Sequence, residues 1–325
     1  MVNRHEGQRS RHLPRDSSVP AAESWVLRSL TVDDILRRGT GHVVLGDNLP
    51  LLKSLPDACI DLVYIDPPFN TGQSQTLRRI RTERDETNGD RSGFQGKRYR
   101  TVQLGSLSYV DIHDDYLAFL EPRLTEIRRV LRESGSLYFH VDYREVHYCK
   151  VLLDCLFGRD CFMNEIIWAY DYGARTTKKW PPKHDNILVY VKNTSEYYFD
   201  AEAVERIPYM APRLVGEEKA ARGKLPTDTW WHTIVPTNGS ERTGYPTQKP
   251  VGILRRIVQA SSPPGGVVAD FFAGSGTTGA VCAALGRRFL LADSNPDACQ
   301  IMAKRLTGFP GMVYSGFSPS YDDAR

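Results

Sequence analysis

A glycine-rich turn near the end of the chain limits the fold more than any other feature. Residues 274–279 read Gly-Ser-Gly-Thr-Thr-Gly and follow the apolar run Val267–Ala269, which predicts a buried strand, a tight turn and a helix. The turn matches the pattern of nicotinamide dinucleotide sites, with Asp293 where their ribose-binding acid is expected. Such folds need several strand and helix units after the turn, whereas only one of each remains here. The rest of the sheet must therefore come from residues that precede the turn.

A second motif, Asp66-Pro67-Pro68-Phe69, stands much earlier in the chain. It follows the apolar run Leu62–Ile65, so both motifs are expected at the carboxyl ends of buried strands, where open α/β sheets bind ligands. The two prolines fix their own φ angles and restrain the residue before each, which makes the turn stiff. A carboxylate and nearby main-chain carbonyls accept hydrogen bonds and donate none, which suits an exocyclic amine. Phe69 can stack on the base that carries the amine.

These groups favour a direct reaction on an aromatic amine. If acceptors engage both N–H bonds, the nitrogen can pyramidalise and point its lone pair at an electrophile. No covalent enzyme intermediate is needed, and the chain has no Pro-Cys dipeptide of the kind that attacks pyrimidine C6. Taken alone, either motif is also consistent with a connector that binds nothing. Their presence in one sheet favours a nucleoside-type cofactor beside an amine substrate.

Alternating strands and helices predict an α/β fold with a doubly wound, mostly parallel sheet. Strands are expected at 43–46, 60–65, 137–141, 166–168, 187–191, 267–269 and 289–292. Helices are expected at 49–55, 116–131 and 146–157, after Pro250, up to Gly286 and after Pro296. The catalytic half of the domain is placed at 23–199 and the cofactor half at 243–310.

Other segments lack this regularity. Residues 1–22 predict a disordered basic tail, and 311–325 form a second tail. Residues 71–111 hold eight basic and four acidic residues between Arg78 and Arg100, which predicts a mobile basic loop. Residues 200–242 combine arginines with tryptophans and are the candidate for an inserted target-recognition module.

Composition limits the partners. The chain of 325 residues has a net charge of only +3, so binding of a nucleic acid would depend on local basic segments. No apolar run approaches the roughly 20 residues of a membrane span, and the arginine-interrupted start is no signal peptide. The cysteines and histidines have no metal-ligand spacing, so no metal site is expected. These features predict a cytoplasmic protein without a membrane segment.

Together the two motifs resemble the bacterial DNA amino-methyltransferases that use S-adenosylmethionine. They are most similar to the circularly permuted β group, in which the catalytic motif precedes the cofactor motif, and to the methyltransferases of type II and type III restriction-modification systems. The resemblance covers roughly residues 42–306. It implies a Rossmann-like, circularly permuted sheet of seven strands, with 187–191 as an antiparallel edge strand, in a cytoplasmic, nucleoid-associated protein.

The resemblance also implies roles for individual residues. Asp66, Pro67, Pro68 and Phe69 would hold the target amine and base. The residues implied to bind the cofactor are Asp47, Lys249, Asp270, Phe272, Ala273, Gly274, Ser275, Gly276 and Asp293. Among them, Lys249 would face the methionine carboxylate, Asp293 the ribose and Asp47 the adenine. Trp168 and Tyr170 fall where the family lines its target-base pocket.

A base inside a duplex must be flipped out before it can react, so the protein must hold the opened DNA. The candidates for these contacts are Arg78, Arg79, Arg81, Lys97, Arg98, Trp230 and Trp231. Two alternatives stay open. The basic stretch is also consistent with a solvated segment, and the tryptophan pair is equally consistent with a small satellite core.

The resemblance implies methyl transfer to adenine N6 of double-stranded DNA, because Asp at the first motif position is typical of N6 enzymes and Ser of cytosine-N4 enzymes. Two positions depart from the family pattern, since Phe69 stands where Tyr is commoner and Asp293 where Glu is more frequent. Cytosine N4 stays an alternative, because the chemistry of the Asp66 motif works for either amine. Further alternatives are an RNA or protein amine methyltransferase and a catalytically idle DNA-binding subunit. A homodimer and a cognate restriction endonuclease are partners on which the sequence does not decide.

Overall fold

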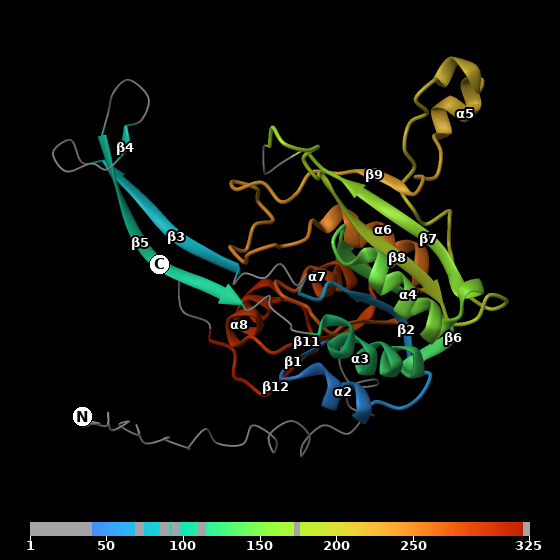
Figure 1. Cartoon of the computed structure of the whole chain (residues 1–325), viewed down its shortest axis with the longest axis horizontal. Helices are drawn as coiled ribbons and strands as arrows, with labels where there is room; N and C mark the ends of the chain where they lie inside the picture. The colour runs from blue at the N-terminus through green and yellow to red at the C-terminus, as the bar shows by residue number, and fades with distance from the viewer. Residues whose placement is uncertain are drawn as a thin grey trace, which may run out of the picture.

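The computed structural model describes residues 41–68, 75–84, 91–92, 98–109, 115–171 and 176–320. Its centre is a nine-stranded sheet in the order β12-β1-β11-β10-β2-β6-β8-β7-β9 (Figure 1). The strands are β1 (Gly41–Leu45), β2 (Ile60–Ile65), β6 (Leu131–Asp142), β7 (Phe162–Ala169), β8 (His184–Val191), β9 (Thr229–Trp231), β10 (Val267–Asp270), β11 (Arg288–Asp293) and β12 (Met312–Ser315). Neighbours from β12 to β6 pair in parallel, which confirms the mostly parallel sheet.

The expected number of strands and the expected edge were wrong. β8 lies inside the sheet, antiparallel to both β6 and β7, and seven of its eight residues are buried. Such burial requires a neighbour on each side as well as cover on both faces. The two short strands β12 and β9 extend the seven central strands at either end of the sheet. Since β9 belongs to residues 200–242, part of the segment assigned to an inserted module is a strand of the main sheet.

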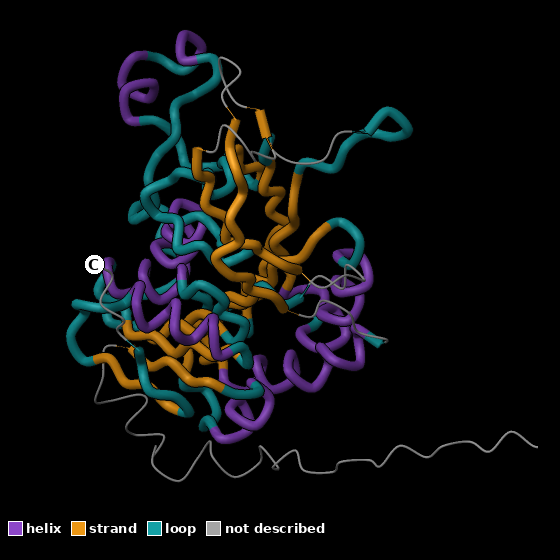
Figure 2. The backbone as a smooth tube through the Cα atoms, turned by 90° about the vertical axis from the view of Figure 1, so that its left-hand side faces the viewer, coloured by secondary structure: helices purple, strands orange, loops and turns teal. Residues whose placement is uncertain are grey.

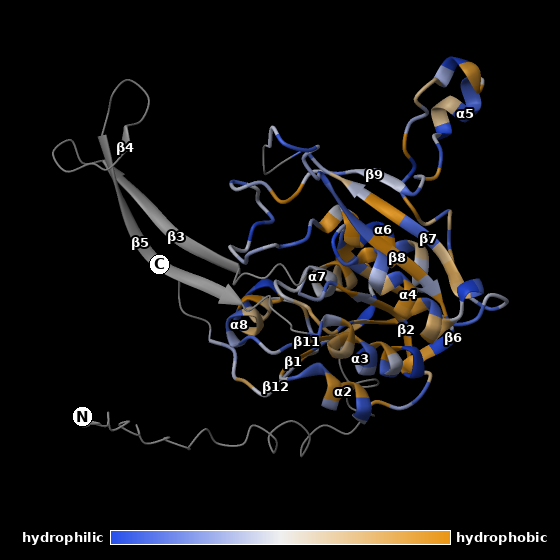
Figure 3. Ribbon diagram, in the orientation of Figure 1, coloured by the Kyte–Doolittle hydropathy of each residue, from blue (hydrophilic) through white to orange (hydrophobic). Residues whose placement is uncertain are grey.

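Helices cover both faces of the sheet, as Figure 2 shows in a view turned by 90°. One apolar core lies under α2 (Asn48–Ser54), α3 (Tyr116–Val130) and α4 (Val146–Phe157). A second core lies on the opposite face under α6 (Val251–Ser261), α7 (Thr277–Ala284) and α8 (Pro296–Arg305). Short helices occur at Arg159–Cys161, Pro212–Leu214 and Glu217–Arg222, the last being α5. Figure 3 shows that the strands and the inner helix faces carry the apolar residues. No helix in the described ranges is long and apolar enough to cross a membrane.

The sequence pattern explains why α3 forms where it does. Asp115 caps the helix by accepting a hydrogen bond of 2.9 Å from the main-chain N–H of Ala118. Its buried residues recur every three or four positions and face the first core: Tyr116, Leu120, Leu124, Ile127 and Val130. Pro122 lies inside the helix, which continues past it as a single element.

The loop expected over 71–111 contains strands instead. β3 (Gln75–Arg84) and β5 (Arg98–Tyr109) pair in antiparallel fashion, and the short β4 (Arg91–Ser92) adds to β5. The segment is too polar for its hydrophobic pattern to reveal a strand, but backbone pairing satisfies its N–H and C=O groups whatever the side chains. Arg78, Arg79 and Arg81 belong to β3, and Arg98 opens β5. Figure 1 shows this hairpin extending away from the main sheet.

The fold brings the two sequence motifs together. β2 and β10 are neighbours in register, with Leu62 opposite Val268 and Val63 opposite Ala269. Because the strands run in parallel, the Asp66 turn and the glycine turn leave the sheet at the same edge. β2 precedes β10 along the chain, and a circular permutation relative to other methyltransferases stays a prediction.

Candidate active site

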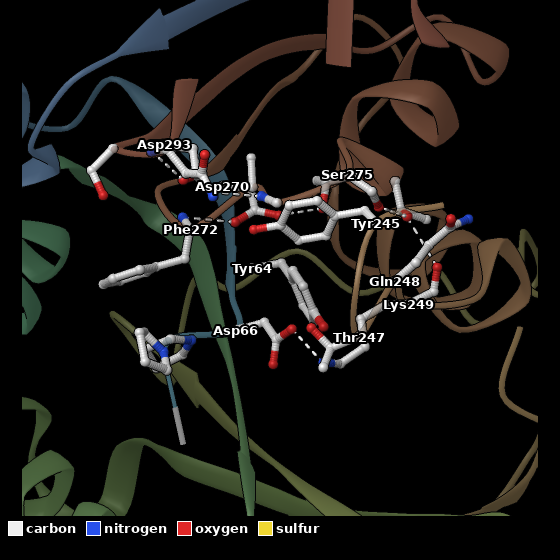
Figure 4. Close-up of a pocket in the computed structure, with 18 of the residues that line it drawn as sticks. Tyr64, Asp66, Tyr245, Thr247, Gln248, Lys249, Asp270, Phe272, Ser275 and Asp293 are labelled. Atoms are coloured by element: carbon white, nitrogen blue, oxygen red, sulfur yellow. Dashed lines mark hydrogen bonds and ion pairs between the residues drawn. The ribbon is translucent and has the colours of Figure 1, made fainter. Parts of the chain in front are cut away.

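A cavity of about 440 Å³ lies at the carboxyl ends of β2 and β10 (Figure 4). Its volume falls within the range of small-molecule sites. Most of the predicted catalytic and cofactor residues line it: Asp66, Pro67, Pro68, Lys249, Asp270, Phe272, Ala273, Gly274, Ser275 and Asp293. Two motifs that are about 200 positions apart in the chain therefore form one site.

The glycine turn is built for close approach of the backbone. Gly274 and Gly276 have φ angles of 50° and 72°, which side chains other than glycine rarely adopt. A Cβ at Gly276 would lie 2.7 Å from Cγ of Met302, and one at Gly274 would lie 3.0 Å from Cε1 of Tyr245. Gly276 caps α7 rather than lining the cavity. The turn leaves room above it for a ligand and for the start of a helix.

Two buried carboxylates hold this turn in place. Asp270 accepts hydrogen bonds from Oγ1 of Thr278 (2.6 Å) and the main-chain N–H of Phe272 (3.1 Å), and burial raises its pKa to about 7. Asp293 accepts from the main-chain N–H of Gly274 (2.8 Å) and Asn295 (2.9 Å). Burial raises the pKa of Asp293 as well. Each oxygen of Asp293 retains a further lone pair, which can accept a hydrogen bond from a ligand hydroxyl in the cavity.

Asp66 and Lys249 form an ion pair inside the cavity. The Lys249 ammonium donates to Oδ2 of Asp66, and the two side chains are only 11% and 17% exposed. The second oxygen, Oδ1, is buried and accepts no hydrogen bond from any described residue. The site therefore presents one neutralised carboxylate with one unengaged acceptor atom. The predicted contact of Lys249 with a cofactor carboxylate stays a prediction.

The segment before α6 is shaped to deliver Lys249. Thr247 has a φ of 57°, an uncommon backbone conformation for a β-branched residue. Oε1 of Gln248 accepts from both the main-chain N–H and the hydroxyl of Thr243, each at 2.8 Å, while its amide donates to the Glu241 carbonyl at 2.7 Å. The Thr277 hydroxyl donates to the Lys249 carbonyl at 3.0 Å, which ties this segment to the glycine turn.

A buried polar network lies behind Asp66. The Tyr64 hydroxyl is 2.7 Å from Nδ1 of His140, whose Nε2 is 3.2 Å from Oδ2 of Asp185. Nδ1 of His140 also lies 3.7 Å from Oδ1 of Asp66. The Tyr170 hydroxyl donates to Oδ1 of Asp185 at 3.0 Å. Burial alone would raise the pKa of Asp185, but the hydrogen bonds from His140 and Tyr170 hold it below its usual range.

Trp168 and Tyr170, the predicted lining of the target-base pocket, belong to this neighbourhood. The Trp168 ring packs edge-on against His140 and Tyr170, with centroid distances of 5.5 and 5.3 Å. Trp168 is only 2% exposed and donates from Nε1 to the His232 carbonyl at 2.6 Å. Tyr170 is therefore the more accessible of the two rings, and Trp168 supports it from within the core.

Several predicted residues lie elsewhere. Asp47 caps α2 by accepting from the main-chain N–H of Leu49 (3.1 Å) and pairs with Arg123 (2.9 Å), away from the cavity wall. Trp230, predicted as a DNA contact, is a buried residue. Trp230 is 8% exposed, packs in the second core and donates from Nε1 to the Thr227 carbonyl at 2.7 Å.

The neighbouring tryptophan faces the opposite way. Strand side chains alternate between the two faces of a sheet, so Trp231 is 75% exposed next to buried Trp230. Phe69 and Lys97 lie outside the described residues, as does the tail at 1–22. Across the described ranges, no group of three or more His, Cys, Asp or Glu residues could hold a metal ion.

Sequence reasoning missed part of the site. Tyr64, Phe119, Tyr245 and Gln248 line the cavity, and His140 and Asp185 stand behind it. Tyr64 looked like one more residue of an apolar strand. The available signal was His140, a polar residue within the otherwise apolar run Leu137–Val141.

Comparison with known proteins shows the family of the chain. The family model of N6/N4 methyltransferases, described as DNA methylase, matches residues 60–304. Type II methyltransferase M.HpaI of Haemophilus parainfluenzae is 28% identical over 265 residues, which cover 82% of this chain and 74% of that protein. DNA adenine methyltransferase YhdJ of Escherichia coli K12 is 29% identical over 277 residues, which cover 81% of this chain and 82% of that protein.

Solved structures share the fold. M1.HpyAVI in complex with S-adenosylmethionine aligns with a TM-score of 0.53 at 18% identity, covering 82% of this chain and 99% of that one. The cytosine-N4-specific PvuII DNA methyltransferase aligns with a TM-score of 0.55 at 16% identity, covering 82% of this chain and 88% of that one. At these identities the likeness establishes a common architecture, which confirms the expected methyltransferase fold.

Proposed function

Because the chain belongs to the N6/N4 family of DNA methylases, we propose that it transfers the methyl group of S-adenosylmethionine to the N6 amine of adenine in double-stranded DNA. The observation that carries the proposal is the unengaged Oδ1 of Asp66. Asp66, which carries this buried acceptor, lines the same cavity as the glycine turn. An amine donor and the cofactor would thus meet at adjacent strand ends.

The residues present fit a nucleoside cofactor that ends in an amino acid. The positive φ angle at Gly274 lets the backbone approach a ligand, and the spare lone pairs of Asp293 suit ribose hydroxyls. Phe272 and Phe119 lie at the cavity with ring centroids 6.1 Å apart, and they offer an apolar wall for a purine. When bound, the cofactor supplies an electrophilic sulfonium methyl group.

The protein's part in the reaction is to hold the amine. Oδ1 of Asp66 and the Pro67 carbonyl would accept the two N–H bonds, so that the nitrogen lone pair points into the cavity. The Lys249 ammonium donates to Oδ2 and so keeps the carboxylate oriented. Methyl transfer would require the amine to lose a proton, and Oδ1 of Asp66, which would already accept one of its N–H bonds, could take that proton. Most of the acceleration would come from this positioning.

Adenine is favoured over cytosine by the acidic first residue of the motif, Asp66, and by the adenine specificity named for YhdJ. Cytosine N4 is the second candidate, because the PvuII enzyme, which shares the fold, is named as cytosine-N4-specific. The hydrogen bonds offered by Asp66 and Pro67 suit either exocyclic amine.

The test supplies labelled S-adenosylmethionine with unmethylated DNA, RNA and protein in parallel. We expect label only in DNA, with N6-methyladenine as the product after digestion to nucleosides. N4-methylcytosine in its place would establish the second candidate, and label confined to RNA or protein would refute the proposal. Asp66→Ala provides the inactive control.

A further inference from the structure

A second feature of the active-site edge is an exposed tryptophan in the connection between β7 and β8. Trp180 is 93% exposed, although indole is among the largest apolar side chains. Single exposed apolar residues are common on protein surfaces and need no function. Three further properties distinguish Trp180: its position, the stiffness of its backbone and the charge around it.

The connection leaves the sheet beside the catalytic network. Its base is closed by a hydrogen bond of 2.9 Å from the main-chain N–H of Tyr170 to the Lys183 carbonyl. The Tyr170 hydroxyl is hydrogen-bonded to Asp185, and Asp185 is hydrogen-bonded to His140. Nδ1 of His140 in turn lies 3.7 Å from Oδ1 of Asp66. β8 begins beside the carboxyl end of β6, with Asp185 opposite Asp142, and β6 runs parallel to β2. The connection therefore lies at the sheet edge where Asp66 follows β2, and DNA whose base reaches Asp66 would lie next to it.

The backbone at Trp180 is stiff. Pro181 and Pro182 follow it directly, and a residue before proline is restricted to extended conformations. The prolines themselves have fixed φ angles. An exposed aromatic ring on a restrained backbone loses little conformational entropy when it binds, so it is suited to insertion into a partner.

The surroundings of Trp180 are basic. Lys178 and Lys179 precede it and are exposed, while Lys183 follows the prolines and is partly buried. The nearest described acidic residues in the sequence, Asp171 and Asp185, stand at the two ends of the connection, and Asp185 is buried in the network with His140. Lysines on both sides of an aromatic ring match phosphates on both sides of a base step.

We propose that Trp180 inserts into double-stranded DNA at the target site and occupies the stacking position that the flipped base leaves. The inference rests on the proposed function and adds the element that keeps the duplex open. The indole replaces the lost stacking on the neighbouring bases, and Lys178 and Lys179 contact phosphates beside the gap. The insertion lowers the free energy of the flipped state before methyl transfer.

The experiment compares Trp180→Ala and Trp180→Phe with the wild-type chain. Its probe is a duplex with the sequence that the wild type methylates, in which a fluorescent base replaces the target base: 2-aminopurine for adenine or pyrrolocytosine for cytosine. The fluorescence of either base rises when the base leaves the stack, and the methylation rate is measured on the same duplex without the fluorescent base. Tyr148→Ala is the matched control, because Tyr148 is an exposed aromatic (63%) on α4.

We expect Trp180→Ala to reduce both the fluorescence change and the methylation rate about tenfold, the effect of losing one stacking contact. Trp180→Phe should retain most of both signals. When the target base is mismatched, unstacking costs less, and the defect of Trp180→Ala should shrink to within about threefold. Tyr148→Ala should match the wild type on both duplexes.

Wild-type fluorescence and rate for Trp180→Ala would overturn the inference. An equal defect on matched and mismatched duplexes would also overturn it, because it would indicate a general contact with DNA. Failure of the proposed function would look different, since the wild-type chain itself would then methylate no DNA.

Discussion

The Lys249 ammonium is bonded to the carboxylate of Asp66, a residue 183 positions away in the chain. The pair joins the segment before α6 to the turn after β2 (Figure 4). It neutralises the carboxylate while leaving its second oxygen at the cavity without a hydrogen bond from any described residue. The pair thus connects the cofactor side of the site with the amine side.

Removing the acceptor should abolish methylation without removing the cofactor. We expect Asp66→Asn to lower the rate of methyl transfer at least about a hundredfold, because the amide presents an N–H group where the substrate amine needs an acceptor. Binding of S-adenosylmethionine, measured by calorimetry, should change little. A variant with near wild-type rates would contradict the assignment of Asp66.

Removing the cation should destabilise the fold. Lys249→Met keeps the length of the side chain but leaves the Asp66 carboxylate largely buried without a counter-charge. We expect a loss of about 3 kcal/mol in the free energy of unfolding, the low end for broken buried pairs. Urea denaturation measures this loss.

The double variant Lys249→Met with Asp66→Asn provides the control. It removes both charges, so it should recover most of the lost stability, and the two effects should be strongly non-additive. Additive losses would show that the ion pair contributes nothing beyond the packing of the two side chains.

The buried carboxyl group of Asp270 should make stability depend on pH. Its pKa is raised by burial from 3.8 to about 7, so the folded protein retains a proton that the unfolded chain releases near pH 4. Between these values the unfolded state binds fewer protons, and stability therefore falls as the pH rises toward 7. Asp270→Asn cannot ionise, so its stability should fall less over this range. The melting temperatures of the wild type and Asp270→Asn are measured from pH 4 to pH 8. Identical slopes of melting temperature against pH would contradict the prediction.

The glycine turn should tolerate no side chain at Gly276. A Cβ there would meet Met302 at 2.7 Å with φ at 72°, so strain and overlap act together. We expect Gly276→Ala to cost about 2–4 kcal/mol and to weaken cofactor binding. Gly286→Ala is the control, because Gly286 has a φ of 67° and open space around it. It should cost only about 1 kcal/mol, and equal losses in the two variants would show that the contact with Met302 is not limiting.

Local pattern predicted most of the strands and helices, because each depends on neighbours in the sequence. The bounds of β2 and α4 agree with the expected ones, and the α3 spacing marks its buried face. The β3–β5 pair was missed because the many charged and glycine residues of 71–111 are typical of a loop. The sequence left open whether Trp230 and Trp231 pack in a core or contact DNA, because the identity of a tryptophan does not tell which face of a strand it occupies.

The sequence by itself determined the chemistry that the chain can carry. A carboxylate on a stiff Pro-Pro turn, a glycine turn that ends a strand, and the order of the two follow from residues that are close together in the chain. Only the tertiary structure decided which distant residues meet: Lys249 on Asp66, His140 between Tyr64 and Asp185, and β8 in the interior of the sheet. Those contacts depend on strand order and packing, and neither can be predicted from the spacing of residues that are close together in the sequence.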